Sequence, residues 1–322
     1  MRSAWKIVAV ALGLASMMSS AHAQMTKMTI GAGVDPSFSA FFVAKSAGIF
    51  EKNGLDVTVK TGPSGSAMVA YVIQNQIQAA FGAEVAGIQD FNLDGNVVTI
   101  GEGALMPQYY GFVGRNISTL EEAKGKKIGI ARGSASEVFW LAMIEKLKLN
   151  AKDYNIVQVD APEMIAALER GNIDGFTCWE PWLTRAVMSV PNTKILKTSE
   201  GIMSPRVYVY LNRGWAEKNR LAALAFVRSL IEANARINKD PDAEADLVST
   251  FLKLDKDLTK ALMRQVRFDL RFDNGSVENF VLAHEQLKQL GKLAKPVAWD
   301  KFLYSDLLKE LSPEKVAYSL PK

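Results

Sequence analysis

The stretch MTIGAGVDPSFSAFFVAKSAGIFEKNGLDVTV, residues 28–59, decides the fold. Its pattern predicts a strand over 28–31, a loop over 31–37 and a second, alternating strand over 55–59. Between loop and second strand, apolar residues recur at helical spacing: Phe38, Phe41, Phe42 and Ile49. Such a unit pairs its strands in parallel and lays the helix across one face of the sheet. Ligands of open α/β sheets bind beyond the carboxyl ends of the strands, so the loop is a candidate for function, with a merely structural loop as the alternative.

The first 23 residues predict an export signal that is removed from the mature chain. Arg2 and Lys6 precede an apolar run over 7–18, and Ala21 and Ala23 supply the small residues of a cleavage site. The apolar run is shorter than the roughly 20 residues that a membrane-spanning helix needs. We therefore expect cleavage after residue 23 and a periplasmic location, without a lipid anchor because no cysteine stands directly after the apolar run.

The mature chain is nearly neutral. Removal of the signal takes two of the 38 basic residues and none of the 34 acidic ones, which leaves a net charge of +2 over 299 residues. A bias this small gives no indication of nucleic acid or an anionic membrane as a partner. The length allows two lobes with separate cores, and we expect a monomer.

The supply of cysteine and histidine disfavours an enzyme. Cys178 is the only cysteine, so no disulfide forms within the chain, and His284 is the only histidine of the mature protein. A Ser–His–Asp triad or a zinc site would lack its usual parts. We predict no catalytic residues, no metal and no cofactor, and a small buried hydrophobe at Cys178 rather than a nucleophile.

A weak internal repeat predicts two lobes of similar construction. A shift of 96 residues places residues 68–72 on 164–168, and Glu84 on Glu180. Both copies follow the order helix, turn, short strand, loop, helix. The alternative is chance similarity between two βα units.

The predicted domains follow from this repeat. Residues 24–115 form the first part of lobe 1 and residues 116–204 form lobe 2. The alternating segment 204–211 is the candidate return crossover. Residues 205–322 contain this crossover, complete lobe 1 and end in a mostly helical region.

Three loops each follow a strand, precede a helix and consist of small or hydroxyl residues: 35–37, 64–66 and 134–136. The free amides and dipole of a helix N-terminus favour carboxylate, sulfonate or phosphate groups, although serine is also simply a good N-cap. None of the loops matches a Walker loop or a G-x-G-x-x-G fingerprint, so nucleotide binding has no support.

Other side chains are candidates for the walls of a cleft. Trp179 offers a flat apolar face, and Glu84 and Glu180 can accept hydrogen bonds from a ligand or complement the dipole of their own helices. Arg206, inside an otherwise apolar strand, is a better candidate than Arg132 for pairing with an anion. Tyr109 and Tyr110 fit either the cleft or the core of a lobe.

The chain resembles the periplasmic substrate-binding proteins of ABC transporters that handle alkanesulfonates, taurine and nitrate, which share a domain with thiamine-pyrimidine synthesis proteins. Four segments carry the resemblance: Pro36 with AKSAGIFEKNGLDV at 44–57, Leu120 with GKKIG at 125–129, AL at 167–168 with GNIDG at 171–175, and WEPW at 179–182.

The resemblance implies a two-lobed α/β fold of periplasmic-binding-protein type II, with the ligand in a cleft between the lobes. It also implies delivery of the ligand to an ABC permease that an ATPase drives. The binding role then falls on Ser37, Phe38, Ser64, Gly65, Ser66, Glu84, Ser134, Ala135, Ser136, Trp179 and Glu180.

The sequence therefore predicts a receptor for a small organic anion, sulfonate or taurine-like compounds first and aromatic or other carboxylates next. The alternative is an enzyme like those of thiamine-pyrimidine synthesis, or a protein that binds a pyrimidine precursor. The small-residue loops contain no cysteine and no histidine, which departs from the enzymes of that branch.

Overall fold

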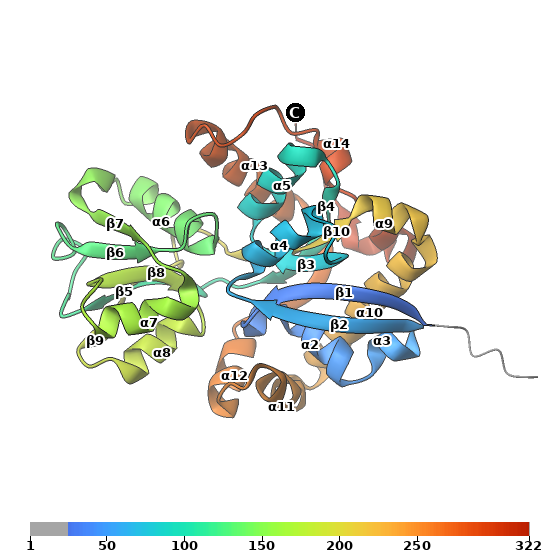
Figure 1. Ribbon diagram of the computed structural model, residues 1–322, viewed down its shortest axis with the longest axis horizontal. Coiled ribbons are helices and arrows are strands. Elements are labelled where there is room, and N and C mark those ends of the chain that lie inside the picture. Colours follow the sequence, from blue (N-terminus) through green and yellow to red (C-terminus); the bar gives the residue numbers. More distant parts are fainter. Residues whose placement is uncertain (1–24, 322) are drawn as a thin grey trace, which may run out of the picture.

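The computed structural model describes residues 25–321, so the predicted export signal lies outside the described residues. The chain forms two α/β lobes, each built on its own sheet (Figure 1). This confirms the predicted two-lobed α/β fold. None of the described helices has the length and apolar character to cross a membrane.

Lobe 1 contains a seven-stranded sheet in the order β12-β11-β4-β10-β3-β1-β2. Its strands are β1 (Thr26–Gly33), β2 (Leu55–Gly62), β3 (Ala79–Gly82), β4 (Val97–Leu105), β10 (Arg206–Asn212), β11 (Arg267–Asp273) and β12 (Val316–Ala317). Its main helices are α2 (Ser39–Ser46), α3 (Ile49–Lys52), α4 (Gly65–Ile73), α5 (Glu84–Asp94), α10 (Arg220–Lys239) and α13 (Asn274–Gln289). Helices α4, α5 and α13 cover one face, and α2, α3 and α10 cover the other (Figure 1).

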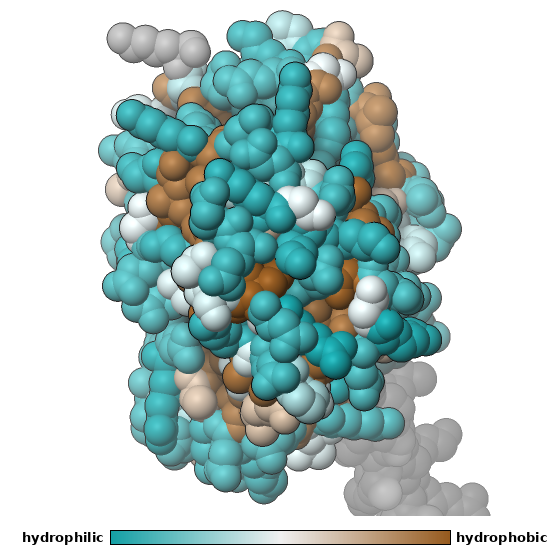
Figure 2. All heavy atoms as spheres, turned by 90° about the vertical axis from the view of Figure 1, so that its left-hand side faces the viewer, coloured by the Kyte–Doolittle hydropathy of each residue, from teal (hydrophilic) through white to brown (hydrophobic). Residues whose placement is uncertain are grey.

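Lobe 2 contains a five-stranded sheet in the order β7-β6-β8-β5-β9. Its strands are β5 (Tyr110–Arg115), β6 (Lys127–Ile130), β7 (Asn155–Gln158), β8 (Gly175–Trp179) and β9 (Thr193–Thr198), and its helices are α6 (Ala135–Lys146), α7 (Ala161–Glu169) and α8 (Trp182–Ser189). Figure 2 shows the end of the molecule that lobe 2 forms, where hydrophilic residues cover most of the surface and separate small apolar groups.

The opening stretch folds as the pattern predicts, with one difference. β1 and β2 pair in parallel, and the helical segment between them crosses one face of the sheet. The segment is not one helix: Pro36–Phe38 forms a single 3-10 turn, and Gly48 separates α2 from α3. Gly48 has φ 70°, a left-handed conformation that glycine adopts without steric cost.

The 96-residue repeat is present in the structure. α4 and α7 begin and end 96 residues apart, and in each lobe the strand after that helix pairs in parallel with an earlier strand, β3 with β1 and β8 with β6. The turns match too, since Asn75 and Gly171 both have positive φ. Each sheet also receives one antiparallel strand from a crossover, β10 in lobe 1 and β5 in lobe 2.

The predicted boundary after residue 115 needs correction. β5 pairs with β8 and β9, so residues 110–115 belong to the sheet of lobe 2. The first crossover is therefore the segment 106–109, and the return crossover is 199–205. The pattern of residues 108–113, bordered by Gly111 and Gly114, predicts an extended segment but does not indicate which sheet it joins.

The C-terminal region is mostly helical, as predicted, but it also contains β11, which the sequence reading missed. Its remaining helices are α9 (Arg213–Lys218), α11 (Pro241–Leu252), α12 (Lys256–Met263), α14 (Trp299–Phe302) and α15 (Asp306–Leu311). Phe268, Leu270 and Phe272 alternate with charged residues and are buried, so the signal for this strand was present.

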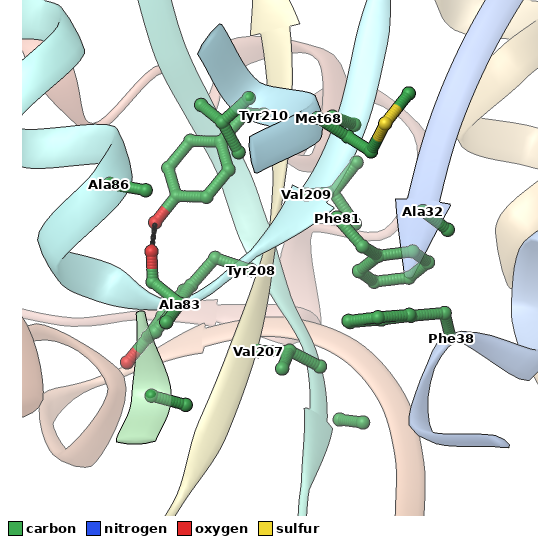
Figure 3. Close-up of a cluster of buried hydrophobic side chains, with 14 of the residues drawn as sticks. Ala32, Phe38, Met68, Phe81, Ala83, Ala86, Val207, Tyr208, Val209 and Tyr210 are labelled. Carbon is green, nitrogen blue, oxygen red and sulfur yellow. Dashed lines mark hydrogen bonds between the residues drawn. The ribbon is translucent and has the colours of Figure 1, made fainter. Parts of the chain in front are cut away.

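Core side chains of lobe 1 pack on both faces of its sheet, and Figure 3 shows part of this cluster. Phe38 stacks on Phe81 with ring centroids 5.3 Å apart. Tyr210 is fully buried, and its hydroxyl donates to the carbonyl oxygen of Ala83 at 3.0 Å. Ala83 immediately precedes α5, so this bond fixes where the helix begins.

We expect Gly87→Ala to lower the free energy of unfolding by about 1–3 kcal/mol, because a Cβ at Gly87 would overlap the ring of Tyr210. Gly214→Ala in α9 is the matched control. There the nearest non-local atom, Asn96 Oδ1, is 3.5 Å from an added Cβ, and alanine stabilises a helix relative to glycine. Urea denaturation of both variants measures the difference, and equal effects would contradict the close packing at Gly87.

Candidate functional site

A small pocket lies between the two lobes, where the predicted loops converge. Its walls are Asp35, Phe38, Ser64, Gly65, Ser66, Ala83 and Val207 from lobe 1, and Tyr110, Ser134, Ala135 and Trp179 from lobe 2. Seven of the twelve predicted site residues are therefore brought together. We call this the central pocket.

The central pocket is small. Its volume is about 20 Å³, whereas even one water molecule needs roughly 10–15 Å³ measured in the same way. A larger molecule can enter only after side chains or whole lobes move apart.

The two crossovers run side by side, with the amide of Met106 donating to the carbonyl oxygen of Pro205 at 2.9 Å. A relative rotation of the lobes would bend the chain at these two segments.

Three helices begin at the central pocket. Ser64 caps α4 by accepting from the amide of Ala67 at 3.0 Å, and Ser134 caps α6 by accepting from the amide of Ser136 at 3.2 Å. α5 begins directly after Ala83. The positive ends of these helices face one space, and none of the described residues that line it is basic. The helix N-termini are therefore the groups that can favour an anion here.

Asp35, in the predicted loop 35–37, lines the central pocket although it was not among the predicted site residues. It is 3% exposed, and its Oδ1 accepts from the amide of Ser37 at 2.7 Å and from the hydroxyl of Tyr109 at 2.9 Å. Burial raises the pKa of Asp35 to about 7, against the opposing effect of these hydrogen bonds. Asx residues are strong N-caps, and that signal could have identified Asp35 before Pro36.

The structure separates the two neighbouring tyrosines. Tyr109 is fully buried and holds Asp35, whereas Tyr110 lines the central pocket. The Tyr110 hydroxyl is buried without a hydrogen-bond partner among the described residues. Burial raises the pKa of Tyr110 well above its usual value, so the hydroxyl stays protonated and can donate to a ligand.

Three predicted residues make bonds that hold the fold rather than face the central pocket. Ser136 Oγ donates to the carbonyl oxygen of Thr177 at 2.6 Å. Glu180 accepts from both the amide and the hydroxyl of Thr184, at 3.0 and 2.9 Å. Arg206 does not face the pocket, since its Nε donates to the fully buried Glu102 at 2.8 Å.

Two further predicted residues are buried beside the central pocket without lining it. Ser37 is 1% exposed and its Oγ has no partner among the described residues. Glu84 is 2% exposed, and burial raises its pKa to about 7. Its Oε2 likewise has no partner within the described part of the chain.

An ion pair joins the lobes at one side of the cleft. Lys292, just after α13, donates to Glu137 Oε2 in the first turn of α6 at 3.0 Å. The same oxygen accepts from the amide of Gly133 at 2.8 Å. The Glu137 carboxylate is thus held in place within lobe 2 and forms an ion pair with Lys292 of lobe 1.

The described residues contain no group of three or more side chains suited to hold a metal ion. Cys178 is fully buried, and burial raises the pKa of its thiol well above the usual value. A reactive cysteine is partly exposed and has a lowered pKa, so Cys178 has the opposite character.

Comparison with known proteins finds a family model and relatives that are named as binding proteins. A model of the NMT1-like family matches residues 21–252. A Bacillus subtilis (strain 168) protein named for binding aliphatic sulfonates is 26% identical over 254 residues, which is 76% of this chain and 75% of that one. The taurine-binding periplasmic protein of Escherichia coli (strain K12) is 31% identical over 135 residues, or 40% and 41% of the two chains.

Solved structures match the fold over nearly the whole chain. The alkanesulfonate-binding protein SsuA from Xanthomonas axonopodis pv. citri, bound to MOPS, superposes with a TM-score of 0.75 at 14% identity, covering 92% of this chain and all of that one. The desulfurization enzyme DszB superposes with a TM-score of 0.70 at 15% identity, covering 90% and 99%. The periplasmic-binding-protein-like fold is therefore confirmed, and it occurs in both binding proteins and an enzyme.

We expect Asp35→Asn to stabilise the protein at pH 8 and to have little effect at pH 4. Burial raises the pKa of Asp35 to about 7 in the folded chain, whereas the ordinary pKa of an aspartate is 3.8. The contribution of Asp35 to stability is thus full at low pH and is lost as the pH rises through this interval. Asparagine keeps an oxygen for Ser37 and Tyr109 but carries no charge, so the gain reaches up to about 4 kcal/mol.

Denaturant unfolding at both pH values measures this effect. Asp300→Asn, at an exposed position, is the control and should change neither value. A gain for Asp35→Asn that is the same at pH 4 and pH 8 would show that the charge of Asp35 is not its cause.

Proposed function

The chain belongs to the NMT1-like family, and we propose that it is the solute-binding component of an ABC importer for a small organic anion. The observation that carries the proposal is the convergence of three helix N-termini on one pocket between the lobes. Sulfonates and taurine-like compounds are the first candidates, and aromatic or other carboxylates are the next. The names of the relatives support this order.

The proposed mechanism is closure of the lobes about the two crossovers. In the open form the ligand binds against the N-termini of α4 and α5, and closure brings α6 and Trp179 against it. The volume of about 20 Å³ supports this motion, because a sulfonate cannot enter the pocket in its present form. In the closed form the helix N-termini of both lobes interact with the negative charge of the ligand. The ligand therefore has more affinity for the closed form than for the open form.

The proposed location is the periplasm, and the proposed partners are a permease and an ATPase, with the protein acting as a monomer. The predicted export signal and the periplasmic relative support the location. A role as an enzyme is the less favoured alternative, although DszB shares the fold. Its obvious nucleophile would be Cys178, which is fully buried and has a raised pKa.

A thermal-shift screen of sulfonates, carboxylates, nitrate and pyrimidines tests the proposed ligand class. A ligand present at 100 times its Kd adds about 2.7 kcal/mol to the free energy of unfolding, a readily measured shift. We expect sulfonates to give the largest shifts. Shifts from neutral or cationic compounds alone would contradict an anion site, and shifts from pyrimidines alone would favour the alternative function.

We expect Trp179→Ala to weaken binding of the best ligand at least about tenfold, because it removes an aromatic wall of the pocket. Trp215→Ala is the control, since Trp215 lies in a different region of lobe 1 and does not line this pocket. Isothermal titration calorimetry gives both affinities. Equal losses in the two variants would argue against a site beside Trp179.

We expect Lys292→Ala to weaken ligand binding by up to about fivefold, because the closed form loses its ion pair with Glu137. The loss should shrink at high salt, which screens the pair. Lys288→Ala is the matched control, since Lys288 pairs with Glu285 within the same helix and this ion pair does not connect the lobes.

Distances between spin labels on Lys60→Cys and Lys194→Cys measure lobe opening directly. Both positions are exposed, one in each sheet, and the native Cys178 is buried. Lys292→Ala should broaden the distance distribution toward longer values. An unchanged distribution together with unchanged affinity would show that the ion pair does not hold the lobes closed.

A further inference from the structure

A second and larger cavity lies between the lobes. Its volume is about 520 Å³, within the range of small-molecule sites. Val138 of α6 forms one wall and Leu282 of α13 the other, with Met203 of the return crossover also lining it. We call this cavity the α6–α13 groove.

Two buried polar groups line the α6–α13 groove without hydrogen-bond partners. Oε2 of Glu84 and Nδ2 of Asn279 each lack a partner at hydrogen-bond distance among the described residues, and the two residues are 2% and 7% exposed. The two side chains lie near each other, since Asn279 lowers the pKa of Glu84 against the larger, raising effect of burial. Buried polar groups in proteins are nearly always paired. One group is an acceptor and the other a donor, so a single ligand group that donates and accepts would satisfy both.

The groove and the central pocket share two walls. Ala83 lines the central pocket and the next residue, Glu84, lines the groove. On α6, Ala135 lines the central pocket and Val138, one turn later, lines the groove. The two cavities therefore adjoin along the first turns of α5 and α6.

We propose that the α6–α13 groove is a second compartment of the ligand site and binds a primary carboxamide or a similar donor–acceptor group. The ligand N–H donates to Glu84 Oε2, and the ligand carbonyl oxygen accepts from Asn279 Nδ2. The apolar side chains of Val138, Met203 and Leu282 contact the aryl or alkyl part between this group and the acid. Placing the acid in the central pocket rests on the proposed function, whereas the chemistry of the groove does not.

Three probes test the proposal by calorimetry: benzenesulfonate, 4-carbamoylbenzenesulfonate and benzamide. In the wild type we expect the carbamoyl group to tighten binding of the sulfonate about tenfold, as one good buried hydrogen-bonded pair does. Glu84→Met removes the acceptor and should reduce this ratio to about one. Glu145→Met, at an exposed residue on the rim of the same groove, is the matched control and should leave the ratio unchanged.

Asn279→Leu is the second test variant, in case Glu84→Met does not fold, and it should also bring the ratio close to one. A ratio near one in the wild type, or a tenfold ratio that persists in both test variants, would contradict the proposal that Glu84 and Asn279 bind a carboxamide in the groove. If neither sulfonate binds, the proposed function fails, and the binding of benzamide alone then tests whether the groove binds a carboxamide. If benzamide binds to the wild type and Glu84→Met abolishes this binding, the proposed carboxamide site is supported. If benzamide does not bind, the proposed site is contradicted.

Discussion

The chain passes between its two lobes twice, and the architecture of the cleft depends on these two adjacent crossovers. The Met106–Pro205 hydrogen bond ties them together, and each leads directly into or out of a strand in the middle of a sheet. The lobes can therefore rotate about a short double connection but cannot slide apart. Tyr109, in the first crossover, holds Asp35 of lobe 1 and accepts from the amide of Glu180 of lobe 2. The connection and the pocket are thus one bonded unit.

The electrostatics of the cleft combine helix N-termini with buried acids. The amides at the starts of α4, α5 and α6 favour an anion, whereas an ionised Asp35 in the same wall would repel one. Burial resolves part of this conflict, because it raises the pKa of Asp35 to about 7 and so favours the neutral acid below that pH. A ligand that carries a donor beside its acid resolves the rest. Taurine-like compounds have both groups, which is a physical reason to rank them with the plain sulfonates.

Local patterns in the sequence predicted the loops of the site well. Ser64 and Ser134 were recognisable as N-caps from their place before apolar helical runs, and a cap needs only its own helix. Arg206 was predicted to face the cleft and does not, because its side chain pairs with Glu102, which is 104 residues away in β4. A long-range ion pair has no local signature. The same limit explains why β5 could not be assigned to a sheet.

The internal repeat shows why one of two equivalent glutamates is free to bind a ligand. Glu84 and Glu180 stand 96 residues apart, near the starts of α5 and α8. Four residues after Glu180, Thr184 supplies an amide and a hydroxyl that satisfy its carboxylate. Four residues after Glu84 stands Ile88, which has no hydroxyl to donate, and Glu84 Oε2 has no partner in the described chain. An unpaired buried carboxyl costs stability in the free protein, and a donor from a ligand recovers that cost on binding. The two lobes therefore share a construction and differ at the position where the groove begins.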